Sequence, residues 1–216
     1  MRVIDDHAEK TGKKVMFAFN ITADMDTMMR NHDIVLAAGG TCVMIDMVPV
    51  GLVAVEYLRR HTQLPIHAHR AGWGMMTRHP QLGMDFVAFQ KFFRLAGVDH
   101  VHVNGLKSKF YESDESVIAS ARECLTPMLG GYTVMPVFSS GQWAGQAPET
   151  YRVLGSTDLI YLAGGGIMAH PGGPAAGVRS LQQGWDAAMK NIPLEDYAHS
   201  HEELRQAIEM YSGLRV

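Results

Sequence analysis

The chain has 216 residues, of which 47% are hydrophobic, 19% charged and 8% aromatic, a composition typical of globular proteins rather than disordered or fibrous ones. Its formal net charge of −3 argues against a nucleic-acid-binding protein that works by neutralising phosphates. No apolar run reaches the roughly 18 residues of a membrane-spanning helix and the polar N-terminus lacks the apolar core of a secretion signal, so we expect a cytoplasmic protein with no membrane partner.

Short β-rich runs alternate with longer helical stretches along the chain. The expected strands are residues 14–20, 41–46, 65–69, 100–103, 133–138 and 158–162. The expected helices are residues 24–38, 52–60, 86–96, 115–128, 148–154 and 175–190, with one or two more within 194–211. Six strand–helix units in a row predict a parallel sheet with right-handed crossovers. No Pro-, Ser- or charge-rich linker divides these units, so we expect one domain over residues 1–216.

The number of units and the place of the glycine-rich loop decide between two α/β folds. An open doubly wound sheet accommodates six units, but its phosphate loop usually follows the first strand. Here Gly164, Gly165 and Gly166 follow the last expected strand. A late phosphate site is typical of a TIM-type (β/α)8 barrel, which needs eight units and about 250 residues. The sequence therefore predicts such a barrel with about six of its eight units present.

Polar residues follow four of the expected strands, where the active sites of barrels are built. His69 and His102 are candidate acid–base groups or phosphate donors, with inward-facing core histidines as the alternative. Arg70 is a candidate for paired contacts to a phosphate or carboxylate, with a surface salt bridge as the alternative. Ser139 is read as an oxygen-binding group, because no triad partners can be chosen for it.

Two further features fit an anionic ligand. The triple glycine allows backbone N–H groups to approach an anion, although an isolated run of this kind is more often a tight turn. Lys109 lies in a polar stretch, residues 104–115, from which a lysine could close over a bound anion; a solvated loop lysine is the alternative. Together these residues predict a phosphorylated or carboxylated small substrate.

The motifs PIHAHRAGWG, DHVHVNGLKSK, MPVFSSGQW and YLAGGGIMAHPGGPAAG, in this order, resemble the C-terminal barrel of the RuBisCO large-chain superfamily. The likeness is greater to RuBisCO-like proteins than to true carboxylases, and greatest to the branch linked to 3-oxo-isoapionate 4-phosphate decarboxylation. It implies catalytic roles for His69 and Lys109. It also implies a substrate- or phosphate-binding role for a larger set: Arg70, His102, Ser139, Gly141, Gly164 and Gly165.

The departures from the family pattern are informative. Carboxylases carry a second histidine where this chain has Trp73, and their Ser-Gly-Gly reads Ser139-Ser140-Gly141 here, which argues against CO₂ fixation. The resemblance implies Mg²⁺ for the intact enzyme, but the Lys-x-Asp-Glu motif that supplies its ligands does not occur in this chain. We therefore expect no metal ligands here and a barrel whose first two units and N-terminal domain are absent.

Three functional hypotheses follow. The resemblance implies a partial enzyme whose intact form enolises or decarboxylates a phosphorylated sugar acid or ketose with Mg²⁺, as a homo-oligomer, a dimer in the family. The first alternative is an inactive remnant that only binds phosphorylated ligands. The second is a metal-dependent hydrolase, which is suggested by the two His-x-His pairs, His67/His69 and His100/His102. The sequence leaves open the true substrate, the oligomeric state and whether this chain is active in isolation.

Overall fold

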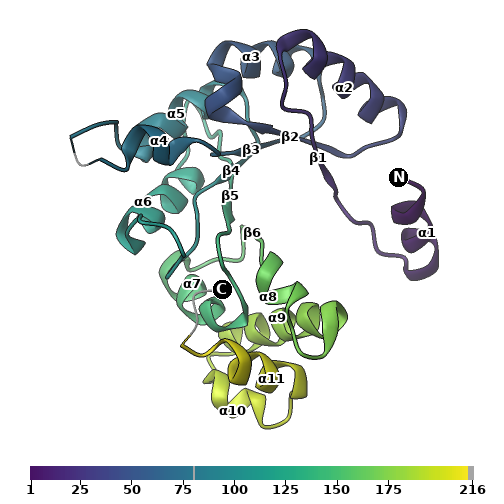
Figure 1. Ribbon diagram of the computed structural model, residues 1–216, viewed down its shortest axis with the longest axis vertical. Helices are drawn as coiled ribbons and strands as arrows, with labels where there is room; N and C mark the ends of the chain where they lie inside the picture. Colours follow the sequence, from purple (N-terminus) through teal and green to yellow (C-terminus); the bar gives the residue numbers. More distant parts are fainter. Residues whose placement is uncertain (80, 214–216) are drawn as a thin grey trace. The chain divides into compact units, whose positions relative to one another are not determined.

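The computed structural model describes residues 1–79 and 81–213 (Figure 1). Hydrogen bonding orders the strands β1-β2-β3-β4-β5-β6, and the pairs β1–β2, β2–β3, β3–β4 and β5–β6 are all parallel. The chain divides into two units, unit 1 with residues Met1–Val101 and unit 2 from His102 onward.

Unit 1 carries the first three strands, most of the fourth and five helices. They are α1 (Arg2–Thr11), β1 (Ala18–Asn20), α2 (Met25–Ala37), β2 (Cys42–Asp46), α3 (Met47–His61), β3 (Ile66–His69), α4 (Trp73–Thr77), α5 (Phe86–Ala96) and the start of β4 (His100–His102). Figure 1 shows α2 and α3 on the same side of β1 and β2. This is the strand–helix alternation that the sequence predicts.

The helix ends of unit 1 follow local sequence signals. Asp24 precedes α2 and accepts a hydrogen bond from the Thr27 backbone N–H at 3.1 Å, while Asp85 does the same for α5 with Val87 at 2.8 Å. Such caps satisfy N–H groups that have no partner within the helix. Gly97 ends α5 with a φ of 98°, a left-handed conformation that glycine adopts without steric cost.

The core of unit 1 lies between the sheet and its helices. Val43, Ile45, Ile66 and Ala68 of β2 and β3 are fully buried, as is Leu58 of α3. Alternate residues of a strand point to the same face, so this burial belongs to the face that the crossover helices cover. In contrast, α1 has no buried residue, and the segment before β1 exposes Val15, Met16 and Phe17.

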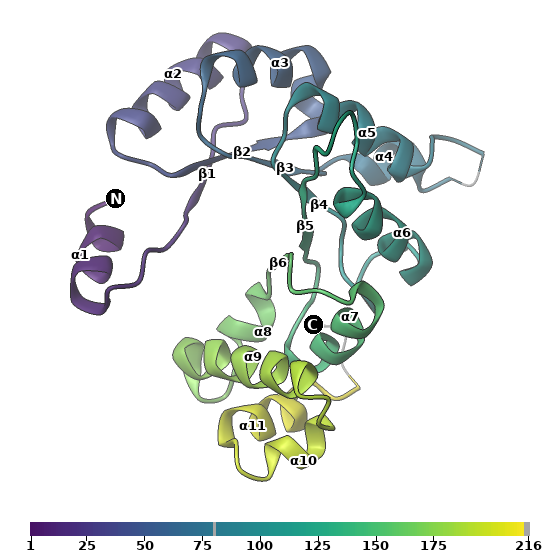
Figure 2. The same cartoon turned by 180° about the vertical axis from the view of Figure 1, so that it is seen from behind.

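Unit 2 carries the end of β4, the last two strands and the helices that follow α5 in the described chain. They are α6 (Asp114–Leu125), β5 (Met135–Phe138), a 3₁₀ turn (Ala144–Gln146), α7 (Ala147–Leu154), β6 (Ile160–Tyr161), α8 (Gly164–Met168), α9 (Gly173–Met189), α10 (Leu194–Ala198) and α11 (Glu202–Tyr211). In Figure 2, α9 lies beside α8 and α11. A buried cluster joins the 3₁₀ turn to the last two helices: Trp143, Ala144, Ala198, Leu204, Ala207 and Tyr211.

All six predicted strand–helix units are present, with shifted boundaries. The first strand spans Ala18–Asn20 instead of residues 14–20, and the last spans only Ile160–Tyr161. The helix expected at 52–60 starts earlier, at Met47, and is broken by Gly51 at a φ of 74°. Helices α1, α4 and α8 were not predicted. Within the described ranges, no helix combines the length and apolar character needed to cross a membrane.

Both cysteines, Cys42 and Cys124, are buried free thiols. Burial raises the pKa of the Cys42 thiol to about 11, with the nearby Asp99 carboxylate acting in the same direction. A thiol of this kind stays protonated at neutral pH and is a poor nucleophile. Cys42 therefore contributes to packing rather than to chemistry.

Candidate functional site

In unit 1, His69 lies at the end of β3 and contacts Asp46 at the end of β2. The two residues are register partners in the parallel pair, and His69 Nδ1 lies 3.0 Å from Asp46 Oδ1. The Ala71 backbone nitrogen lies 3.1 Å from the same ring nitrogen. A protonated Nδ1 donates to Asp46, whereas an unprotonated Nδ1 accepts from Ala71. The ring is therefore held at the end of β3 in either tautomer.

Arg70 follows His69 directly and is buried rather than placed at the surface. Its relative exposure is 7%, which argues against the surface salt bridge considered as an alternative. The guanidinium carbon lies 3.7 Å from the centre of the Phe86 ring and 5.8 Å from that of Trp73. Stacking on an aromatic face is favourable for arginine. It also restricts the guanidinium before any ligand binds.

His67 and His100 lie deeper in β3 and β4 and form a pair in which His67 is buried and His100 is partly buried. They are register partners, with their Nδ1 atoms 3.4 Å apart. Burial, and then the neighbouring His100 and His69, lower the pKa of His67 to about 4. Burial also lowers the pKa of His100, against an opposing effect of Asp99. Both rings are neutral at neutral pH, which fits core histidines.

In unit 2, His102 at the end of β4 contacts the serine pair that follows β5. His102 Nδ1 lies 3.2 Å from Ser139 Oγ, and Ser139 Oγ lies 3.3 Å from Ser140 Oγ. His102 is 5% exposed and Ser139 is 9% exposed. The structure thus brings together two of the predicted phosphate-binding residues as a hydrogen-bonded group of an imidazole and two hydroxyls.

Two residues that the sequence analysis missed extend this group. The Ser140 hydroxyl donates to Asn104 Oδ1 at 3.2 Å, and Asn104 Nδ2 donates to Glu112 Oε2 at 2.6 Å. Asn104 lies two residues after the end of β4 and so occupies a strand end, as the predicted site residues do. Its place at a strand end is the feature of the sequence that could have identified Asn104 as a site residue. No sequence pattern marks Glu112, which lies in the following loop.

The loop after β4 packs closely against the turn after β5. Gly105 lies against the Gln142 side chain and the Ser139 carbonyl oxygen, leaving no room for a Cβ. Gln142 is fully buried; its amide donates to the Leu106 carbonyl at 3.1 Å and accepts from the Tyr161 hydroxyl at 3.2 Å. This contact fixes the start of the lysine-bearing loop relative to Ser139.

The remaining candidates are exposed or partly exposed. Gly164 and Gly165 form the first turn of α8 and are exposed, whereas Gly141 is half-buried with a φ of 79°. Lys109 is exposed in the loop. His170, which follows the triple glycine, is buried and bonded through both ring nitrogens to the backbone of Gly172 and Glu203, which is a structural role. The roles of the glycines and of Lys109 stay predictions.

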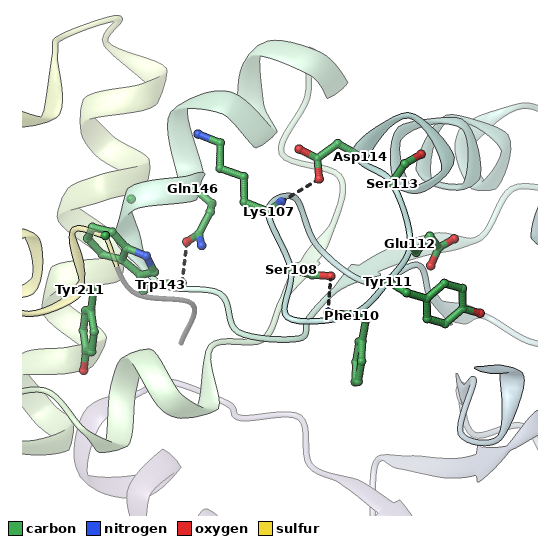
Figure 3. A pocket seen from close by; sticks show the side chains of 12 residues that line it. Lys107, Ser108, Phe110, Tyr111, Glu112, Ser113, Asp114, Trp143, Gln146 and Tyr211 are labelled. Carbon is green, nitrogen blue, oxygen red and sulfur yellow. Dashed lines mark hydrogen bonds between the residues drawn. The ribbon is translucent and has the colours of Figure 1, made fainter. Parts of the chain in front are cut away.

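A cavity of about 750 Å³ lies beside the lysine-bearing loop in unit 2 (Figure 3). Figure 3 shows Trp143 and Tyr211 on one side of it, and Tyr111 and Glu112 on the other. None of the predicted site residues lines this cavity. Its walls are Lys107, Ser108, Phe110, Tyr111, Glu112, Ser113, Asp114, Trp143, Gly145, Gln146, Tyr211 and Gly213.

A metal site needs several ligating side chains gathered at one point. Across residues 1–79 and 81–213, no three His, Cys, Asp or Glu side chains gather into a group able to hold a metal. The described residues therefore do not by themselves fit the magnesium site that the resemblance implies.

Comparison with known proteins gives consistent matches over nearly the whole chain. The model of the family "Ribulose bisphosphate carboxylase large chain, catalytic domain" matches residues 1–211. A 3-oxo-isoapionate-4-phosphate decarboxylase of Rhizobium etli is 53% identical over 210 residues, 96% of this chain and 50% of that protein. A 3-oxo-isoapionate-4-phosphate transcarboxylase/hydrolase of Xanthobacter autotrophicus is 56% identical over 96% of this chain and 51% of that protein. The chain thus spans about half the length of these relatives.

Solved structures agree with the fold. A RuBisCO-like protein from Burkholderia fungorum matches with a TM-score of 0.93 at 50% identity, over 96% of this chain and 52% of that one. An octameric RuBisCO from Pyrococcus horikoshii matches with a TM-score of 0.90 at 35% identity, over 98% of this chain and 51% of that one. The predicted fold class is confirmed.

Proposed function

Because this chain belongs to the ribulose bisphosphate carboxylase large-chain family, we propose that it is part of a RuBisCO-like enzyme acting on a phosphorylated sugar acid by decarboxylase-type chemistry. The observation that carries the proposal is the group formed by His102, Ser139 and Ser140 at the ends of two strands. The names of the relatives, a decarboxylase and a transcarboxylase/hydrolase of a sugar-acid phosphate, support the same substrate class.

In this proposal the residues of the chain bind and orient the substrate. The Ser139 hydroxyl and the His102 ring hydrogen-bond one phosphate, and Gly141, Gly164 and Gly165 offer backbone N–H groups to another anionic group. His69, held by Asp46 or Ala71, moves a proton at the reacting carbon framework. Lys109 closes over the substrate carboxylate. Arg70, fixed on the Phe86 ring, makes paired bonds to a phosphate.

The whole protein's assembly belongs to the proposal as well. We propose a homo-oligomer, supported by the octameric state of the Pyrococcus horikoshii RuBisCO, and a cytoplasmic location. The hydrolase alternative gains no support, since the described side chains form no metal-holding group. Magnesium would come with residues outside this chain.

Titration calorimetry with a phosphorylated sugar acid tests the proposal. The native chain should bind 3-phosphoglycerate and should bind glycerate, which lacks the phosphate, much more weakly. Arg70→Ala should weaken binding by about 2 kcal/mol, and Arg70→Lys nearly as much, because lysine is a point charge without the planar fork. Arg60→Ala, which removes an exposed arginine on α3, is the matched control.

Circular dichroism accompanies each titration, because Arg70→Ala also removes the packing on Phe86. Equal affinity of the native chain for 3-phosphoglycerate and glycerate would refute phosphate recognition. A folded Arg70→Ala variant with unchanged affinity would refute the role of Arg70.

A further inference from the structure

We infer that Glu112 is a positioning residue that holds the Ser139–Ser140 pair against His102 by way of Asn104. The effect of Glu112 on ligand affinity rests on the proposed function; its effect on the position of the serine pair does not. Hydrogen bonds link Glu112 to Ser140 through the Asn104 side chain. Glu112 thus acts through a chain of hydrogen bonds that lies entirely within unit 2.

Asn104 is the centre of that chain, since three of its polar atoms are engaged. Its Nδ2 donates to Glu112 Oε2 at 2.6 Å, and its Oδ1 accepts from the Ser140 hydroxyl at 3.2 Å. Its backbone carbonyl accepts from the Ser139 N–H, also at 3.2 Å. An ionised carboxylate can only accept, so Glu112 selects the amide orientation in which Nδ2 faces the loop and Oδ1 faces Ser140.

The backbone at both ends of the Asn104–Ser140 bond needs such support. Asn104 has a φ of 65° and Ser140 a φ of 73°, so both non-glycine residues are left-handed. That conformation is unfavourable for most L-residues and persists where surrounding contacts enforce it. The hydrogen bond from Asn104 to the Glu112 side chain is one such contact.

Glu112 is itself anchored by its second oxygen. The Ser116 hydroxyl at the start of α6 donates to Glu112 Oε1 at 2.8 Å. One oxygen thus faces α6 and the other faces Asn104. This separation supplies a matched control, because Ser116→Ala removes a hydrogen bond from the same carboxylate without touching Asn104.

The first test needs no ligand. Hydrogen exchange, read by NMR on the full 216-residue chain, measures protection of the Ser139 amide, which donates to Asn104. Glu112→Ala should speed exchange at Ser139 about tenfold, and Ser116→Ala should leave it unchanged. Glu112→Gln should restore most of the protection, because its amide oxygen still accepts from Asn104. Unchanged protection in Glu112→Ala, or a Gln variant as unprotected as the Ala variant, would overturn the inference.

The second test measures affinity for 3-phosphoglycerate by calorimetry. Glu112→Ala should weaken binding about tenfold, with Glu112→Gln close to native. Ser140→Ala should add little to Glu112→Ala, because both changes break the same chain; fully additive losses would overturn the inference. Failure of the native chain to bind would refute the proposed function alone, since the exchange experiment still decides the positioning role.

Discussion

Replacing Gly105 by alanine should destabilise unit 2 where the lysine-bearing loop begins. A Cβ at this position would overlap Cδ and Nε2 of Gln142 and lie 2.6 Å from the Ser139 carbonyl oxygen. The Gln142 side chain cannot simply move aside. It is fully buried and bonded to both Leu106 and Tyr161.

The expected loss of stability has two parts, overpacking and a weakened hydrogen bond. Overpacking a tight site costs about 1–3 kcal/mol, and one weakened hydrogen bond of Gln142 adds about 1 kcal/mol. A destabilisation of roughly 2–4 kcal/mol lowers the melting temperature of a chain of this size by about 4–16 °C. Thermal melting followed by circular dichroism measures the change.

Gly164→Ala is the matched control for Gly105→Ala. Gly164 lies in the first turn of α8, and no atom lies within 4 Å of a Cβ built there. The melting temperature should therefore stay constant or rise slightly, because alanine is the better helix former. A Gly105→Ala variant that melts within 2 °C of the native chain, by the same assay, would refute the packing argument.

Two more predictions concern unit 1. In the folded chain His67 has a pKa of about 4, against an ordinary value of 6.5. As the pH falls, His67 is therefore protonated in the unfolded chain before it is protonated in the folded chain. The free energy of unfolding should drop by up to about 3 kcal/mol between pH 6.5 and 4. Urea unfolding should show a smaller drop for His67→Gln, and equal drops would contradict this cause. Phe17 is 51% exposed beside the edge strand β1 and should promote self-association of the chain. Light scattering should show less self-association in Phe17→Lys than in the control Met75→Lys. A monomeric native chain would contradict the prediction.

Helix boundaries were most predictable where local signals bracket the element. Helix α5 was predicted to the residue, Phe86–Ala96, because Asp85 caps one end and Gly97 ends the other. The first strand was predicted four residues too long. Residues 14–17 have β propensity, but only Ala18–Asn20 pair with β2, and a strand exists only where a partner supplies hydrogen bonds.

In the candidate site, too, some features were predictable from the sequence and others were not. Strand ends located His69, His102 and Ser139 because the period of a strand fixes which residues share a face. The contact between His69 and Asp46 depends on the register of β2 against β3. The sequence of a single strand does not specify that register. Glu112 reaches Asn104 across a loop, and loop geometry follows from packing such as that of Gly105 rather than from any period.

The strand order also bears on how the chain folds as it is synthesised. Each strand pairs with the strand nearest to it in sequence, as Ala18 does with Cys42 and Val43 with Ile66. These partners lie 24 and 23 positions apart in sequence, so each closure costs less entropy than pairing of the first strand with the last would. Each strand can therefore pair with its predecessor once the crossover between them has been synthesised, without waiting for the C-terminal residues.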